Sequence, residues 1–164
     1  MLTAAGFVVL VLTGASTARV GASPQAAPAA DLRSVWSGVF TDSQAERGSV
    51  IYLQSCAKCH GADLLGDSGA ERPALVGDEF TRVWDGETVG AMFERISTAM
   101  PGDAPGSLMR NAYADLVAYL LRTNGFPAGS NELRPDTAVL ARIAVSRVLP
   151  QSSGPRPNAS PKDP

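Results

Sequence analysis

The sequence predicts an all-α domain, because helical patterns recur along the chain and no segment has a strong strand pattern. One observation is that apolar residues recur at i, i+3, i+4 and i+7 directly after Thr88, a suitable N-cap. These residues are Val89, Met92, Phe93 and Ile96. A second is an apolar face that precedes the helix stop Asn124-Gly125 and contains Tyr113, Leu116, Val117, Leu120 and Leu121. We therefore expect a few helices joined by loops.

The remaining segments complete the expected order of elements. Thr41 and Gln44 have the spacing of a capping box, which predicts a helix over about 41–54. Residues 62–85 carry scattered Gly, Pro and Asp without a sustained period and are expected to be mostly loop, as are the breaker-rich residues 101–106. Asp136 is a suitable cap for a last helix over 136–149.

The two ends of the chain differ in composition from residues 41–133, which we expect to form the folded domain. Residues 1–22 resemble a secretory signal peptide, because a short apolar run is followed by small residues typical of a cleavage site. No Lys or Arg precedes that run, so an uncleaved membrane anchor is the alternative. We expect 23–40 to be a linker, and 134–164 to combine a helix with a disordered tail rich in Pro and Ser.

The most informative feature is the pentapeptide Cys56-Ala57-Lys58-Cys59-His60, since this pattern attaches c-type haem. Both thiols can form thioethers with the vinyl edge of one porphyrin, and the imidazole that follows can bind the iron. The chain has 2 cysteines and 1 histidine, too few for a structural zinc site, which needs about four nitrogen or sulfur ligands. A redox-active thiol pair would need a strand-helix-strand context, and a disulfide would leave His60 without a role. We therefore expect one haem c with its iron, held covalently by Cys56 and Cys59.

Haem iron bound by one histidine has a sixth position, for which Met100 is the best candidate. A thioether at this position stabilises ferrous iron and raises the reduction potential. Met100 follows a predicted helix and precedes Pro101, so a stiff loop can hold this weak ligand at a small ordering cost. Met92 is better explained as core and Met109 as surface or packing. We therefore expect His60 and Met100 to be the two protein ligands of the metal.

The haem motif and Met100 stand in a wider pattern of short segments at 44–48, 73–77, 113–121 and 124–129. With this pattern the chain resembles the small class I c-type cytochromes with one haem. More narrowly, it is similar to the cytochromes and haem domains associated with quinoprotein (pyrroloquinoline quinone) dehydrogenases. The resemblance spans about 41–133 and implies the small cytochrome c fold, in which helices and loops wrap around one covalent haem. It also implies that Gly48 and Tyr52 lie where the first helix crosses the last one, near Tyr119.

Two further residues receive a cofactor-binding role from the resemblance. The carbonyl of Pro73 is implied to accept a hydrogen bond from the ring of His60 and so to orient it, although a turn proline explains Pro73 equally well. The indole N–H of Trp84 is implied to lie beside the haem propionates, and a core tryptophan is the alternative.

The ligand set and the resemblance predict an electron carrier rather than an enzyme. One electron would pass between exported proteins in the periplasm, for example from a quinoprotein dehydrogenase to a terminal oxidase. A gas sensor or a peroxidase would need a displaceable sixth ligand, and peroxide chemistry a distal acid-base group that a chain with 1 histidine lacks. A cytochrome subunit docked permanently on a dehydrogenase is a third hypothesis. The formal net charge of −2 argues against a nucleic-acid partner, and membrane contact is expected only if the N-terminal segment is retained.

Overall fold

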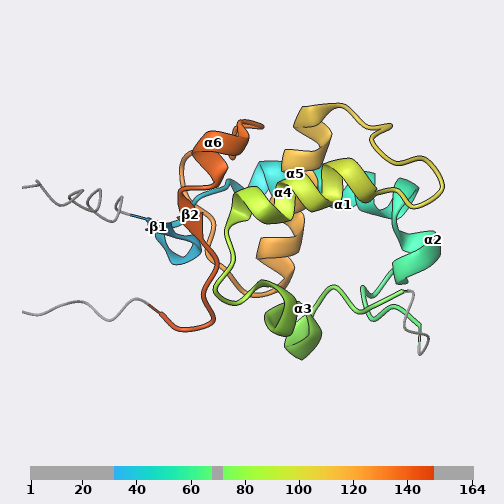
Figure 1. Cartoon of the computed structure of the whole chain (residues 1–164), viewed down its shortest axis with the longest axis horizontal. Coiled ribbons are helices and arrows are strands. Elements are labelled where there is room, and N and C mark those ends of the chain that lie inside the picture. Colours follow the sequence, from blue (N-terminus) through green and yellow to red (C-terminus); the bar gives the residue numbers. More distant parts are fainter. Residues whose placement is uncertain (1–31, 68–71, 150–164) are drawn as a thin grey trace, which may run out of the picture.

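The computed structural model describes residues 32–67 and 72–149, which form a mostly helical domain. Its elements in chain order are β1 (Arg33–Ser34), the 3-10 helix η1 (Val35–Ser37), α1 (Asp42–Ser55), α2 (Ala57–His60), α3 (Gly77–Trp84), α4 (Val89–Ala99), α5 (Arg110–Thr123), α6 (Thr137–Leu140) and β2 (Ile143–Ala144). The predicted all-α class is confirmed, since the described strands are two residues long. Figure 1 shows β1 and β2 at one end of the long axis and α2 at the other. The predicted signal peptide (1–22) and the end of the predicted tail (150–164) lie outside the described residues.

The predicted first helix is confirmed as α1, and its cap Thr41 accepts a hydrogen bond from the backbone N–H of Gln44 at 3.1 Å. The other half of the predicted capping box is not formed. The side chain of Gln44 is buried and instead donates to the carbonyl of Leu133 at 2.9 Å and accepts from its N–H at 2.8 Å. Because a buried amide needs partners for both of its ends, this exchange fixes the chain after α5 to the start of α1.

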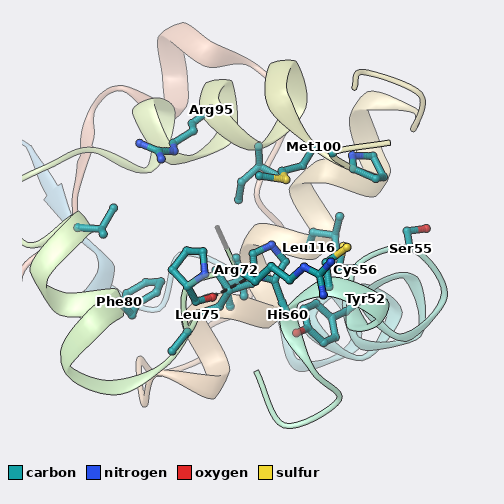
Figure 2. Close-up of a pocket in the computed structure, with 18 of the residues that line it drawn as sticks. Tyr52, Ser55, Cys56, His60, Arg72, Leu75, Phe80, Arg95, Met100 and Leu116 are labelled. Carbon is teal, nitrogen blue, oxygen red and sulfur yellow. Dashed lines mark hydrogen bonds between the residues drawn. The ribbon is translucent and has the colours of Figure 1, made fainter. Parts of the chain in front are cut away.

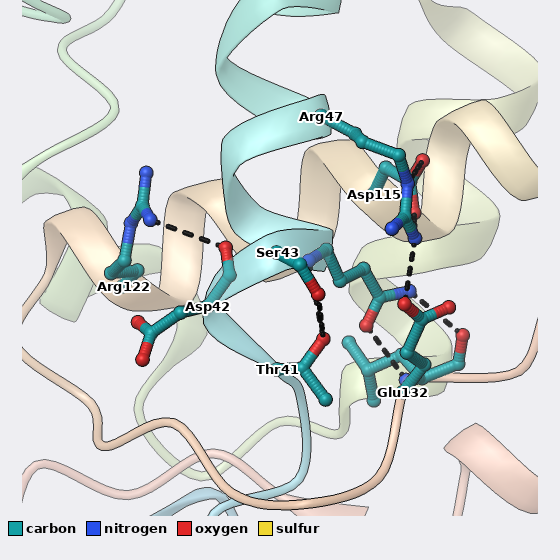
Figure 3. A network of polar contacts seen from close by, with 9 residues as sticks. Thr41, Asp42, Ser43, Arg47, Asp115, Arg122 and Glu132 are labelled. Atoms are coloured by element: carbon teal, nitrogen blue, oxygen red, sulfur yellow. Dashed lines mark hydrogen bonds and ion pairs between the residues drawn. The ribbon is translucent and has the colours of Figure 1, made fainter.

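The crossing of α1 over α5 forms the centre of the fold. An added Cβ on Gly48 would lie 2.0 Å from the carbonyl oxygen of Asp115 and 2.8 Å from Cβ of Tyr119, so only glycine admits this approach. Beside it the rings of Tyr52 and Tyr119 lie 5.3 Å apart between centroids, as predicted. On the exposed side, Arg47 donates to both carboxylate oxygens of Asp115 at 3.0 Å and contacts Glu132 at 3.0 Å (Figure 3). The ion pairs of Arg47 thus lie beside the close contact between the backbones of α1 and α5.

The prediction that 23–40 is a linker is wrong for its described part. Val35, Val39 and Phe40 are buried in the core, and the indole N–H of Trp36 donates to the carbonyl of Ser146 at 2.7 Å. In addition β1 pairs in parallel with β2, with Arg33 opposite Ile143. The segment 32–40 therefore belongs to the folded domain.

The prediction of a helix over 136–149 is correct at its start and wrong in its length. Asp136 caps α6 by accepting from the N–H groups of Ala138 and Val139, but the helix ends at Leu140. Beyond it Ile143 and Val145 are buried while Ala144 between them is half-buried. Such alternation is typical of an extended chain, in which every second side chain faces the core. In a helix, Ile143 and Val145 would not both face the core.

The prediction that 62–85 is mostly loop misses α3, which occupies its last third. This helix begins at Gly77 without a side-chain cap and buries Phe80. The predicted helices α4, capped by Thr88, and α5, which ends at Asn124, are confirmed. Within the described residues, none of the helices has both the length and the apolar character needed to span a bilayer.

Replacing Gly48 by Ala is expected to lower the free energy of unfolding by about 1–3 kcal/mol. The added methyl group would have to push apart two helix backbones, and overpacking of this kind outweighs the helix propensity gained from alanine. Denaturant unfolding of the purified protein measures the change. Gly102→Ala is the matched control, because a Cβ at this position meets nothing within 4 Å. Equal stability of the Gly48→Ala variant and the parent protein would contradict this account of the crossing.

Candidate haem site

A single cavity brings together all six residues to which the sequence assigned a role at the cofactor (Figure 2). It encloses about 1310 Å³, its open mouth included, and lies between α2, α3, α4 and α5. The six residues are Cys56, Cys59, His60, Pro73, Trp84 and Met100. Most of the remaining wall is apolar and includes Leu75, Phe80, Ile96, Leu116 and Leu120.

The haem motif forms one wall of the cavity because α2 follows α1 with no intervening loop. Cys56 ends α1 and starts the single turn of α2, and its carbonyl accepts from the N–H groups of Cys59 and His60, each at 3.0 Å. Both thiols are free and half-buried. Burial raises the pKa of the Cys56 thiol to about 11, and the neighbouring Cys59 adds to the shift. A free Cys56 thiol is therefore protonated at neutral pH.

The ring of His60 is held by a backbone carbonyl. Its Nδ1 lies 3.0 Å from the carbonyl oxygen of Pro73, and the side chain is 8% exposed. Since a carbonyl only accepts, this contact places the ring proton on Nδ1 and leaves the lone pair of Nε2 for a metal. The backbone around the ring is fixed as well, because Tyr52 donates its hydroxyl to the carbonyl of Gly61 at 2.6 Å. His60 is therefore oriented so that its Nε2 could bind a metal.

Met100 lies on the wall opposite His60 and Cys56 in Figure 2. It ends α4, where its N–H donates to the carbonyl of Ile96 at 3.0 Å. Its own carbonyl accepts from the hydroxyl of Tyr113 at 2.8 Å and from the N–H of Gly106 at 3.2 Å. The sequence predicts Tyr113 only as part of an apolar helix face, and its hydroxyl among aliphatic side chains is the one signal that could have indicated this role.

The rim of the cavity carries four charged side chains: Lys58, Arg72, Glu79 and Arg95. The first three have partners of opposite charge in Asp103, Asp67 and Arg82, respectively. Arg95 forms no ion pair with an acidic side chain within residues 32–67 and 72–149. Three of the four charges at the mouth are therefore neutralised by a partner of opposite charge.

Trp84 reaches the cavity from the end of α3, where it is half-buried. Its indole N–H has no hydrogen-bond acceptor in the described part of the chain. A tryptophan that lines a cavity with a free donor can serve a ligand with an acceptor group, whereas a fully buried core tryptophan normally donates to the protein.

These residues fit a haem bound through two thioethers. Two thiols lie together at one side, a nitrogen lone pair and a thioether sulfur lie on facing walls, and apolar side chains fill the space between. Imidazole with thioether is the ligand pair of electron-carrying haem. The cavity therefore suits a planar macrocycle whose metal lies between His60 and Met100.

One protein family and one solved structure are similar to this chain. Residues 43–120 match the model of a family described as "Cytochrome C oxidase, cbb3-type, subunit III". One solved structure, the sulfane dehydrogenase SoxCD from Paracoccus pantotrophus, is 21% identical over 82% of this chain and 73% of its own, with a TM-score of 0.46. Among curated proteins, none has a matching sequence.

The family match contains the haem motif, Pro73, Trp84 and Met100, and it coincides with the helices that form the cavity. A domain of this type implies a c-type haem with iron and a role in electron transfer. The match over residues 43–120, the CXXCH motif and the mostly helical fold are together consistent with a class I c-type cytochrome domain.

Proposed function

We propose that this protein carries single electrons between exported redox proteins on one haem c, bound covalently through Cys56 and Cys59, with His60 and Met100 as the axial ligands. The observation that carries the proposal is the cavity in which an oriented imidazole and a thioether face each other across apolar walls. A haem held by these residues would supply a one-electron couple between ferric and ferrous iron, which suits transfer of an electron from a reduced donor protein to an oxidised acceptor protein.

The chain supports this role by keeping the same two ligands in both oxidation states. His60 is oriented through the carbonyl of Pro73, and Met100 is anchored at its carbonyl by Tyr113 and Gly106. Neither group has to move when the charge on the iron changes by one unit. The thioether and the apolar wall both favour the ferrous state and so raise the reduction potential.

The proposed partners are redox proteins that make a small, transient contact at the cavity mouth. The paired charges of the rim provide little electrostatic steering, so recognition would depend mainly on fit at the haem edge. A quinoprotein dehydrogenase as donor and a terminal oxidase as acceptor are the partner classes that the family resemblance suggests.

We place the protein in the periplasm, because bacterial c-type haem is attached outside the cytoplasm and residues 1–22 resemble a secretory signal. We infer a carrier rather than a peroxidase for a chemical reason. The 1 histidine of the chain is assigned to the iron, which leaves no imidazole to move protons on a bound peroxide.

Replacing Met100 by Ala is expected to open the sixth position. The reduced parent protein should show a low-spin c-type spectrum that carbon monoxide does not change, whereas the reduced variant should bind carbon monoxide and have a lower reduction potential. Optical spectra of the oxidised, reduced and carbon monoxide-treated proteins measure this. Met109→Ala is the matched control, since that side chain is 80% exposed. A low-spin, carbon monoxide-insensitive Met100→Ala variant would refute the ligand assignment. Absence of covalent haem from the exported parent protein would refute the proposed function as a whole.

Replacing Tyr113 by Phe is expected to loosen Met100 without removing it. The variant loses the hydrogen bond to the Met100 carbonyl and the longer one from the N–H of Leu108, and it keeps the buried ring. We expect the free energy of unfolding to fall by about 0.5–1.5 kcal/mol, and the absorption band that reports methionine on ferric iron to weaken. Tyr119→Phe is the control, because the hydroxyl of Tyr119 has no hydrogen-bond partner in the described segments. Equal stability and equal band intensity in the two variants would contradict this role of Tyr113.

A further inference from the structure

An ion pair joins the haem motif to the loop that follows Met100. Lys58 lies between the two cysteines on α2, and its Nζ contacts the carboxylate of Asp103 in that loop. We propose that this pair holds the loop closed across the cavity mouth and slows the release of Met100 from the iron. The proposal rests on the proposed function, specifically on Met100 as the sixth ligand.

The contacts of the loop support this role. Backbone hydrogen bonds within it connect Ala104 with Pro101, Ser107 with Ala104 and Gly106 with Met100. Tyr113 on α5 ties down the two ends of the loop, through the carbonyl of Met100 and the N–H of Leu108. For the middle of the loop, residues 102–107, the pair of Asp103 with Lys58 is the one side-chain hydrogen bond or ion pair to another element in the described part of the chain.

Burial adds little to hold the middle of the loop in place. Residues 102–107 are exposed, and Gly102 would meet nothing within 4 Å if it carried a Cβ. Lys58, Pro101 and Gly102 all line the cavity, so the pair lies at its rim and connects its two walls. Movement of the loop away from α2 would break the pair while costing little apolar burial. This movement also leads away from the wall that carries His60.

The expected size of the effect is modest. The side chains of Lys58 and Asp103 are 55% and 60% exposed, and exposed pairs of this kind change an equilibrium or a rate by roughly 1.5- to 5-fold. Because the Debye length falls from about 8 Å at 0.15 M salt to about 3 Å at 1 M, the contribution should shrink with ionic strength. Lys58 and Asp103 act through Met100 and are positioning residues.

The test measures how fast imidazole displaces Met100 from the ferric, haem-loaded protein. At saturating imidazole the rate is set by the release of Met100, and the loss of the methionine-to-iron absorption band reports it. At low ionic strength we expect Lys58→Gln and Asp103→Asn each to accelerate displacement roughly two- to fivefold. The double variant should match either single variant, because the same contact is lost in all three. High salt should bring the parent protein towards the rate of the variants.

Two controls separate this role from a general effect of charge or stability. Arg82→Gln removes one positive charge from an exposed pair inside α3 and should leave the displacement rate unchanged. Unfolding by denaturant should be the same for Asp103→Asn and the parent protein, since the pair is exposed. Asp103→Asn also lies outside the haem motif, so it keeps the test valid if Lys58→Gln impairs haem attachment.

The results distinguish failure of this proposal from failure of the proposed function. Unchanged rates in Asp103→Asn and the double variant, with the methionine band intact, would overturn the role of the pair and leave Met100 as the ligand. If the parent protein lacks that band and has the same spectrum as Met100→Ala, both proposals are overturned. Acceleration that does not depend on salt would also overturn an ionic role for the pair.

Discussion

The close approach of α1 and α5 at Gly48 is the constraint on which the site depends. With the Asp115 carbonyl at 2.0 Å from an added Cβ, the two backbones are in contact, and the position of one helix fixes the position of the other. α1 runs directly into Cys56 and the haem motif, while α5 carries Tyr113, which holds the Met100 carbonyl. The crossing of α1 and α5 therefore sets the positions of both candidate ligands, His60 and Met100.

The two walls of the cavity are held in different ways. On the His60 side, the ring is fixed by Pro73, which is 13 residues away along the chain, and its backbone by contacts within the same turn. On the Met100 side, the holding groups come from α5 and α2, and they contact the backbone of Met100 and the loop after it rather than its sulfur. We infer that the histidine side is the more rigid, and that any ligand exchange at the iron occurs on the methionine side.

The sequence was sufficient where the determining interactions are local. Thr41 and Thr88 cap helices whose apolar residues have a clear period, and the haem motif places three site residues within one turn of helix. It was insufficient for α3, an eight-residue helix without a side-chain cap, whose apolar Phe80, Val83 and Trp84 follow a segment rich in Gly, Pro and Asp. It also could not show contacts between distant residues, such as Lys58 with Asp103 or Tyr113 with Met100, because no spacing rule connects them.

Segment 32–40 could not be recognised as part of the core from its sequence, because its contacts are also with distant residues. Its buried residues have no period of their own, and its partners lie far along the chain: Trp36 packs against Phe126 and donates to the carbonyl of Ser146, and the carbonyl of Phe40 accepts from the N–H of Gly129. This addition to the core has a functional consequence. It lies with β1 and β2 at the end of the long axis opposite α2 (Figure 1). The extra segments therefore enlarge the hydrophobic core of a small domain without covering the part of the cavity mouth formed by α2, where the proposed haem edge would meet a partner.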